Sequence, residues 1–191
     1  MKNNNERIIL GIDPGTTVTG YGLIAAKSAG AAELLALGVL QLHNYDDHYA
    51  KLKHIFDRVT SLADHFHVTE LAIEAPFYGK NVQSMLKLGR AQGVAIAAAL
   101  SRSLDIYEYA PRKIKLAITG QGNASKEQVA ALLQKMLGIA EMPDTLDATD
   151  ALAVAMCHFF QKKPSANDFD TQTARSWKEF MSKNPQRIKL S

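Results

Sequence analysis

The sequence of 191 residues is 47% hydrophobic and 21% charged, with a formal net charge of +3, and these values are typical of an ordinary soluble globular domain. Its one cysteine, Cys157, excludes an internal disulfide framework and fits a reducing compartment. No apolar stretch precedes Ile8, and none reaches the roughly 18 residues that would suggest a membrane span, so we expect a cytoplasmic protein without a signal peptide.

The chain opens with a predicted buried strand that ends on a carboxylate. RIILGIDPGTT, residues 7–17, is an apolar run that ends on Asp13 and then turns through a Pro-Gly pair. Residues 18–26 and 34–42 predict two further strands, and the short connections indicate an antiparallel meander. Taken alone, Asp13 fits the opening of an Asp-Pro-Gly turn as well as it fits a functional acid.

Helices and strands then alternate along the chain. The predicted elements are a helix at 49–66, a strand at 70–74, a helix at 81–103, a strand at 106–109, a helix at 125–137, and a last helix that starts within 144–147 and ends near 161. Gly89 and Gly93 interrupt the second helix at a cost of about 1 kcal/mol each, so we expect another helix to approach closely there.

This order predicts the fold class and the domain organisation. We expect an α/β fold with a mixed five-stranded sheet, in which three strands are antiparallel and two are parallel, and with helices on both faces. Residues 1–163 form the predicted folded domain. Beyond Pro164 the apolar period is lost, and residues 164–191 are expected to be a polar, weakly ordered tail.

Positive charge is concentrated in two stretches of the chain. Residues 80–126 contain eight Lys or Arg against two acids, and residues 162–191 contain seven against three. A chain with such separated charge can bind a polyanion through its basic stretches. Solvated helix faces are the ordinary alternative explanation.

Four carboxylates stand out by their position at the ends of elements. Asp13 and Glu74 each end an apolar strand, whereas Asp147 and Asp150 lie three residues apart on one face of a helix start. Helix capping alone would explain the second pair. Acids from three elements that converge on one sheet edge would suit two Mg²⁺ ions, which together hydrolyse phosphodiesters. We expect Asp13 to bridge these ions.

The sequence also resembles a known family. The resemblance rests on ILGIDPGTTVTGYGLI, LAIEAPFYGKNVQSMLKLGRAQGVAIAAA, YEYAPRKIKLAITGQGNASKEQV and DATDALAVA, which follow one another within residues 8–160. These stretches are similar to RuvC, the family of bacterial Holliday junction resolvases. The resemblance implies an RNase H-like fold, a homodimer, cooperation with the RuvA and RuvB branch-migration proteins, and a role in recombination and repair. It also implies Mg²⁺-dependent nicking of four-way DNA junctions, with Mn²⁺ able to substitute.

Individual residues match the family's functional positions. The positions of the catalytic, metal-binding acids correspond to Asp13, Glu74, Asp147 and Asp150. Phe77 matches an aromatic residue that the family uses near the branch point, and Lys115 and Lys126 match basic residues at the phosphates near the cut. Further phosphate contacts are expected from the neighbouring basic residues Lys80, Arg90, Arg112 and Lys113. A loop aromatic folded onto the core and solvated lysines are the ordinary alternatives.

The expected dimer surface is the glycine-marked helix at 81–100, which would otherwise be part of the core. Together these features predict an endodeoxyribonuclease that resolves Holliday junctions symmetrically and leaves 5′-phosphate and 3′-hydroxyl ends. Two other functions stay open at this point. One is an RNase H-like nuclease that acts on structured RNA, and the other is a junction-binding protein without catalysis.

Overall fold

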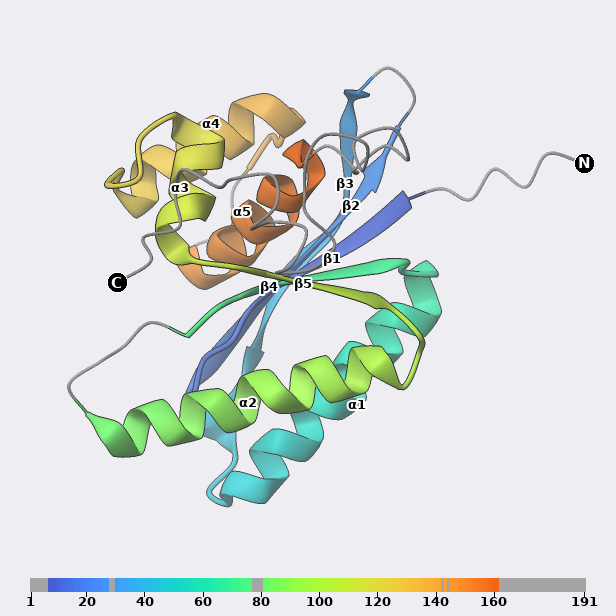
Figure 1. Cartoon of the computed structure of the whole chain (residues 1–191), viewed down its shortest axis with the longest axis vertical. Helices are drawn as coiled ribbons and strands as arrows, with labels where there is room; N and C mark the ends of the chain where they lie inside the picture. The colour runs from blue at the N-terminus through green and yellow to red at the C-terminus, as the bar shows by residue number, and fades with distance from the viewer. Residues whose placement is uncertain (1–6, 28–29, 77–80, 142, 144, 162–191) are drawn as a thin grey trace, which may run out of the picture. The chain divides into compact units, whose positions relative to one another are not determined.

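A mixed five-stranded sheet forms the centre of the computed structural model, which describes residues 7–161 except 28–29, 77–80, 142 and 144 (Figure 1). The strands are β1 (Arg7–Asp13), β2 (Val18–Ala26), β3 (Ala32–Gln41), β4 (Glu70–Glu74) and β5 (Asp105–Tyr109). They lie in the order β3-β2-β1-β4-β5. The first three strands pair antiparallel, whereas β4 and β5 run parallel to β1. The predicted mixed sheet is confirmed.

Helices cover both faces of this sheet, as predicted (Figure 1). They are α1 (His48–Phe66), α2 (Val82–Leu100), α3 (Pro111–Thr119), α4 (Lys126–Leu137) and α5 (Leu146–Phe160), with a short 3-10 turn, η2 (Leu42–Asn44). Among the described residues, no helix has the length and apolar character needed to cross a bilayer. The folded unit ends at Phe160, and the predicted tail at 164–191 lies outside the described residues.

The alternation of side chains in β1 divides the interior into two cores. Leu10 and Ile12 have no exposed surface and pack in the core beneath α1 and α2. Ile9 is equally buried but joins Leu152 in the core beneath α3, α4 and α5. Successive residues of a strand point to opposite faces, so this one apolar strand can serve both cores.

The helix α3 was not predicted from the sequence. Its buried side chains are Ile114 and Ile118, one turn apart, and this apolar pattern is too short to stand out among its lysines and arginine. The signals that identify it are its end residues. Pro111 occupies the first turn and Gly120, at a φ of 74°, ends the helix in the left-handed conformation.

Glycines in β1 and β2 allow α5 to lie directly on the sheet. A Cβ atom added to Gly11 would lie 2.7 Å from the Ala155 nitrogen and 2.8 Å from the Ala155 Cβ. One added to Gly22 would lie 2.8 Å from the Leu152 Cα. Both contacts are closer than van der Waals packing allows, so these positions exclude any side chain.

No helix of the same chain approaches Gly89 and Gly93 among the described residues. Apart from the adjoining backbone of α2 itself, no atom there lies within 4 Å of a Cβ built at either glycine. The helix α1 instead packs against another side of α2, where Ala91, Ala95 and Ala98 are buried. The helix predicted at 81–103 is also shorter than expected and ends at Leu100.

The fixed backbone around Gly11 generates a stability prediction with a matched control. We expect Gly11→Ala to lower the free energy of unfolding by about 3 kcal/mol, because the added methyl group meets the α5 backbone. In Gly38→Ala the methyl group meets the end of the Tyr21 side chain, which can move, so the loss is about 1 kcal/mol or less. Guanidinium unfolding followed by circular dichroism measures both, and equal losses would contradict this account.

Candidate active site

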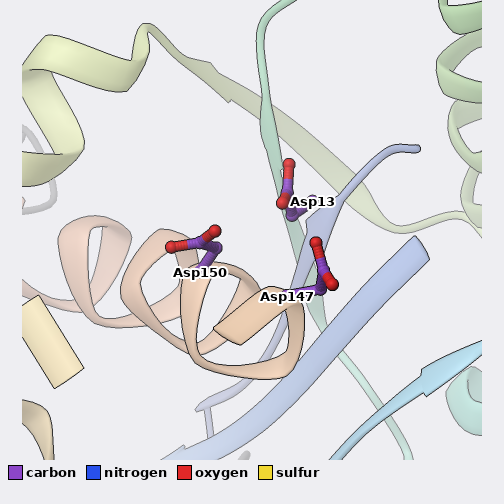
Figure 2. Close-up of side chains that lie close together, drawn as sticks. All are labelled: Asp13, Asp147 and Asp150. Carbon is purple, nitrogen blue, oxygen red and sulfur yellow. The ribbon is translucent and has the colours of Figure 1, made fainter. Parts of the chain in front are cut away.

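Three aspartates meet at one edge of the sheet. Asp13 ends β1, and Asp147 and Asp150 lie one turn apart in the first turns of α5. Each contributes a carboxylate oxygen, and these three oxygens lie within 4.8 Å of one another (Figure 2). The structure therefore brings together side chains that lie more than a hundred residues apart in the sequence.

Glu74 reaches the same edge because β4 runs parallel to β1. Ile12 pairs with Ile73, so Asp13 and Glu74 follow at equivalent positions at the carboxyl ends of neighbouring strands. Glu74, Asp13 and Asp150 line a cavity of about 210 Å³ together with the basic side chains of Lys115 and Lys126. The remaining walls are apolar or small and are formed by Pro111, Ile114, Val129 and Ala153.

The absence of a side chain at Gly20 sets the position of Asp147. Gly20 pairs with Asp13 across the β1–β2 ladder. A Cβ atom at this glycine would collide with the carbonyl oxygen of Asp147 and lie 2.7 Å from its carbonyl carbon. The first turn of α5 can therefore rest against the strand beside Asp13, which places acids of both elements in one site.

Burial and the crowding of acids raise the pKa values of Asp13 and Glu74. The pKa of Asp13 is raised from 3.8 to about 8, chiefly by burial and then by the negative charges of Glu74 and Asp150. The pKa of Glu74 is raised from 4.5 to about 7, again by burial first and then by Asp150. Positive charge from Lys126 opposes both shifts but does not cancel them.

Lys126 supplies positive charge next to the acids. It begins α4 and its ammonium group donates a hydrogen bond to the Asp150 carboxylate. Burial lowers the pKa of Lys126, but the hydrogen bond and the charges of Asp150 and Asp13 outweigh it, so the net pKa is raised. Half of the Lys126 side chain is exposed, which leaves it accessible from the cavity mouth.

The donor set fits hard divalent cations. The three clustered aspartates, and Glu74 on the wall of the same cavity, offer oxygen ligands only, which is the chemistry that Mg²⁺ and similar ions prefer. Burial, and then repulsion from neighbouring acids, raises the pKa values of Asp13 and Glu74 and so disfavours their ionised forms. A bound divalent cation would supply positive charge and favour the ionised form of both groups.

Of the other predicted site residues that the structure describes, only Lys115 and Lys126 line the carboxylate cavity. Lys115 lines the carboxylate cavity, as Lys126 does, whereas the ammonium group of Lys113 lies 4.9 Å from the centre of the Tyr109 ring. Arg112 packs beside Gly122, and Arg90 is exposed on α2. The residues that line the cavity do not include Lys113, Arg112 or Arg90. Phe77 and Lys80 lie outside the described residues.

Sequence reasoning missed the apolar walls of the cavity. Pro111 and Ile114 come from the unpredicted helix α3, and Val129 and Ala153 look like ordinary core residues in the sequence. The signal for α3 was the proline and glycine at its two ends. No local pattern distinguishes Val129 or Ala153, because their role depends on the packing of α4 against α5.

Comparison with known proteins shows the family of this chain. The family model for the crossover junction endodeoxyribonuclease RuvC matches residues 9–158. The RuvC endonuclease of Cytophaga hutchinsonii is 56% identical over 185 residues, which cover 96% of this chain and 89% of that protein. The RuvC of Christiangramia forsetii is 56% identical over 188 residues, which cover 97% of this chain and 94% of that protein.

A solved structure shows the same architecture. The structure of T. thermophilus RuvC in complex with a Holliday junction substrate matches with a TM-score of 0.75 and 33% identity, over 81% of this chain and 93% of that one. The sheet order and the carboxylates at its edge define a nuclease with an RNase H-like fold. Within that class, the chain belongs to the RuvC family of crossover junction endodeoxyribonucleases.

The buried acids predict how the metal-free protein responds to pH. The folded-state pKa of Asp13 lies above its ordinary value, so the folded state holds a proton that the unfolded chain has lost. Stability therefore falls as pH rises from about 4 to about 8. We expect Asp13→Asn to raise the melting temperature at pH 8 in EDTA by about 3 °C or more, with a smaller gain at pH 5.

A second prediction concerns the change in melting temperature on adding divalent cations, measured by differential scanning fluorimetry. Millimolar Mg²⁺ should stabilise the unmodified protein at pH 8, because a ligand that binds only the folded state raises its stability by mass action. Asp13→Asn should respond much less. An equal response of both proteins to Mg²⁺ would show that Asp13 takes no part in cation binding.

Proposed function

We propose that this chain is a Mg²⁺-dependent, homodimeric endodeoxyribonuclease that resolves four-way DNA junctions. One observation carries the proposal. Carboxylates from β1, β4 and α5 share one cavity edge with two lysines, so that ligands for cations and contacts for phosphate lie side by side. Family membership favours a DNA nuclease over the RNA nuclease and the non-catalytic binding protein that the sequence alone left open.

The proposed roles follow from the position of each side chain. Asp13 lies between Glu74 on the neighbouring strand and the α5 aspartates, so it is the residue placed to bridge two cations. Asp147 and Asp150 would complete the ligand set from the helix side. When bound, two Mg²⁺ ions would activate a water and stabilise the leaving oxygen, with Mn²⁺ as a substitute.

The two lysines of the cavity would hold the substrate. Lys115 on α3 and Lys126 on α4 present ammonium groups to the same cavity, where they can contact the oxygens of a phosphodiester. Lys126 pairs with Asp150, so it also limits repulsion within the acid cluster before DNA binds. Hydrolysis at this site would leave 5′-phosphate and 3′-hydroxyl ends, which a ligase can rejoin.

The substrate and partners extend the same proposal. The T. thermophilus relative was solved with a Holliday junction, and we propose the same substrate for this chain. RuvA and RuvB are the proposed branch-migration partners in recombination and repair. Phe77 stays a predicted contact near the branch point, and Lys80 stays a predicted phosphate contact. Cys157 is buried and burial raises its pKa to about 11, which agrees with an unreactive thiol in the proposed cytoplasmic location.

An apolar stripe on α2 supports the homodimer. Val82, Leu86 and Leu100 are 69%, 55% and 58% exposed, and they share a helix face with Gly89 and Gly93. Apart from the adjoining backbone of α2, nothing in the described chain lies within 4 Å of a Cβ at either glycine, which leaves this face open to a second copy. In a two-fold symmetric dimer, each of the two cleaved strands of a near-symmetric junction would meet an equivalent active site.

The catalytic proposal predicts a separation of binding from cleavage. We expect Asp13→Asn to bind a labelled four-way junction within about three-fold of the unmodified protein but to cut it at least about 10³-fold more slowly in Mg²⁺. Asp64→Asn is the matched control, because Asp64 pairs with Arg102 on the surface. Normal cutting by Asp13→Asn would overturn the mechanism, and an RNA hairpin assayed in parallel tests substrate class.

The dimer proposal predicts an effect of charge on the α2 stripe. We expect Leu86→Glu to shift the protein from dimer to monomer at micromolar concentration, because it would bury an unpaired carboxylate in an apolar interface. Met136→Glu on α4, where the side chain is 46% exposed, should leave the dimer intact. Analytical ultracentrifugation distinguishes these results, and a monomeric unmodified protein would contradict the proposal.

A further inference from the structure

A second polar cavity lies beside the turn that follows Asp13. It has a volume of about 190 Å³ and is lined by Thr16, Thr17, Asp46, His48, Lys51 and Lys87. These residues come from the β1–β2 turn, the segment before α1, and the helices α1 and α2. It shares no lining residue with the carboxylate cavity, so it is a separate feature of the surface.

The polar groups of this cavity favour an anion. The lining residues carry two ammonium groups and two threonine hydroxyls against one carboxylate, which leaves an excess of positive charge and of hydrogen-bond donors. The ring nitrogen Nε2 of His48 is buried and has no hydrogen-bond partner within the described residues. A buried polar atom without a partner is costly, so this nitrogen is a polar group near the cavity that the described residues leave unsatisfied.

The wall formed by the β1–β2 turn is held in place before any ligand arrives. The carbonyl oxygen of Thr17 accepts hydrogen bonds from the backbone nitrogens of Leu42 at 2.9 Å and His43 at 3.1 Å. Within the turn, the Thr19 hydroxyl lies 3.2 Å from both the nitrogen and the carbonyl oxygen of Gly15. A preorganised wall loses little entropy when it binds a ligand.

A third hollow borders the active site and is lined by a residue of the same turn. It has a volume of about 140 Å³ and is lined by Pro14, Glu74, Ala75, Pro76 and Leu88. Glu74 also lines the carboxylate cavity, while Leu88 is the neighbour of Lys87 on α2. The three hollows therefore follow one another along the turn after Asp13, in the order acidic, mainly apolar and basic.

This order matches the repeating chemistry of a nucleic-acid strand, in which an apolar sugar and base separate successive phosphates. With the proposed nuclease function as its premise, we propose that the Lys51–Lys87 cavity binds a backbone phosphate of the strand whose scissile phosphate lies at the carboxylates. The strand passes over Pro14 and Leu88 between the two sites. Lys51, Lys87 and the threonine hydroxyls then fix the register of the strand without reading its bases.

Salt-dependent binding of a four-way junction tests this proposal. We expect Lys51→Ala and Lys87→Ala each to weaken junction binding by about five-fold near 100 mM salt. Each should also reduce the slope of log affinity against log salt by about 1. Lys53→Ala is the matched control, since Lys53 lies on the same helix, pairs with Asp57 and does not line the cavity.

A methylphosphonate scan then locates the phosphate. Neutral methylphosphonates placed singly along the cleaved strand should weaken binding by the unmodified protein at one position beside the cut. That sensitivity should disappear in the Lys51→Ala/Lys87→Ala double variant but not in Lys53→Ala. Lys51→Gln and Lys87→Gln, which keep the aliphatic stem, should reproduce the effect with unchanged melting temperatures.

The outcomes separate this inference from the proposed function. If the lysine variants match Lys53→Ala while the unmodified protein still cuts junctions, the cavity is not a phosphate site and the nuclease function stands. If the variants bind weakly but the methylphosphonate at that position still weakens their binding, the lysines attract DNA only by long-range electrostatics. They then do not contact this phosphate, and the inference fails. If the unmodified protein neither binds nor cuts junctions, the proposed function fails first.

Discussion

The close contact between α5 and the sheet is the constraint on which the active site depends. Gly11, Gly20 and Gly22 lie under this helix, and at each of them an added Cβ would overlap atoms of α5. The contact lowers the first turn of the helix onto β1 and β2, so that Asp147 and Asp150 meet Asp13. Close packing of α5 on these glycines therefore brings acids from two distant parts of the sequence into one site.

The acids at this sheet edge are buried close together, which disfavours their negatively charged forms. Burial and mutual repulsion raise the pKa of Asp13 to about 8 and that of Glu74 to about 7. Lys126 offsets only part of this charge through its pair with Asp150. The buried acids therefore destabilise the folded protein at the sheet edge. A bound cation would offset this loss, so the proposed cofactor would also stabilise the protein.

The helix α2 links the proposed dimer with the proposed path of the DNA. Its alanines pack against α1, while its exposed stripe of Val82, Leu86 and Leu100 lies open for a partner. Lys87 and Leu88, from the same turns of the helix, line the two hollows that lead away from the carboxylates. The helix α2 would therefore form the contact between the two subunits, and its Lys87 would also help to fix the position of the substrate strand.

The sequence by itself determined most of the sheet, four of the five helices and the four candidate acids, because apolar runs and helical periods are local signals. The resemblance to the RuvC family then indicated the roles of the acids and of Lys115 and Lys126. Only the tertiary structure decided the rest. Helix α3, the open surroundings of Gly89 and Gly93, and the Lys51–Lys87 cavity depend on which elements pack together, and packing joins residues that no local pattern connects.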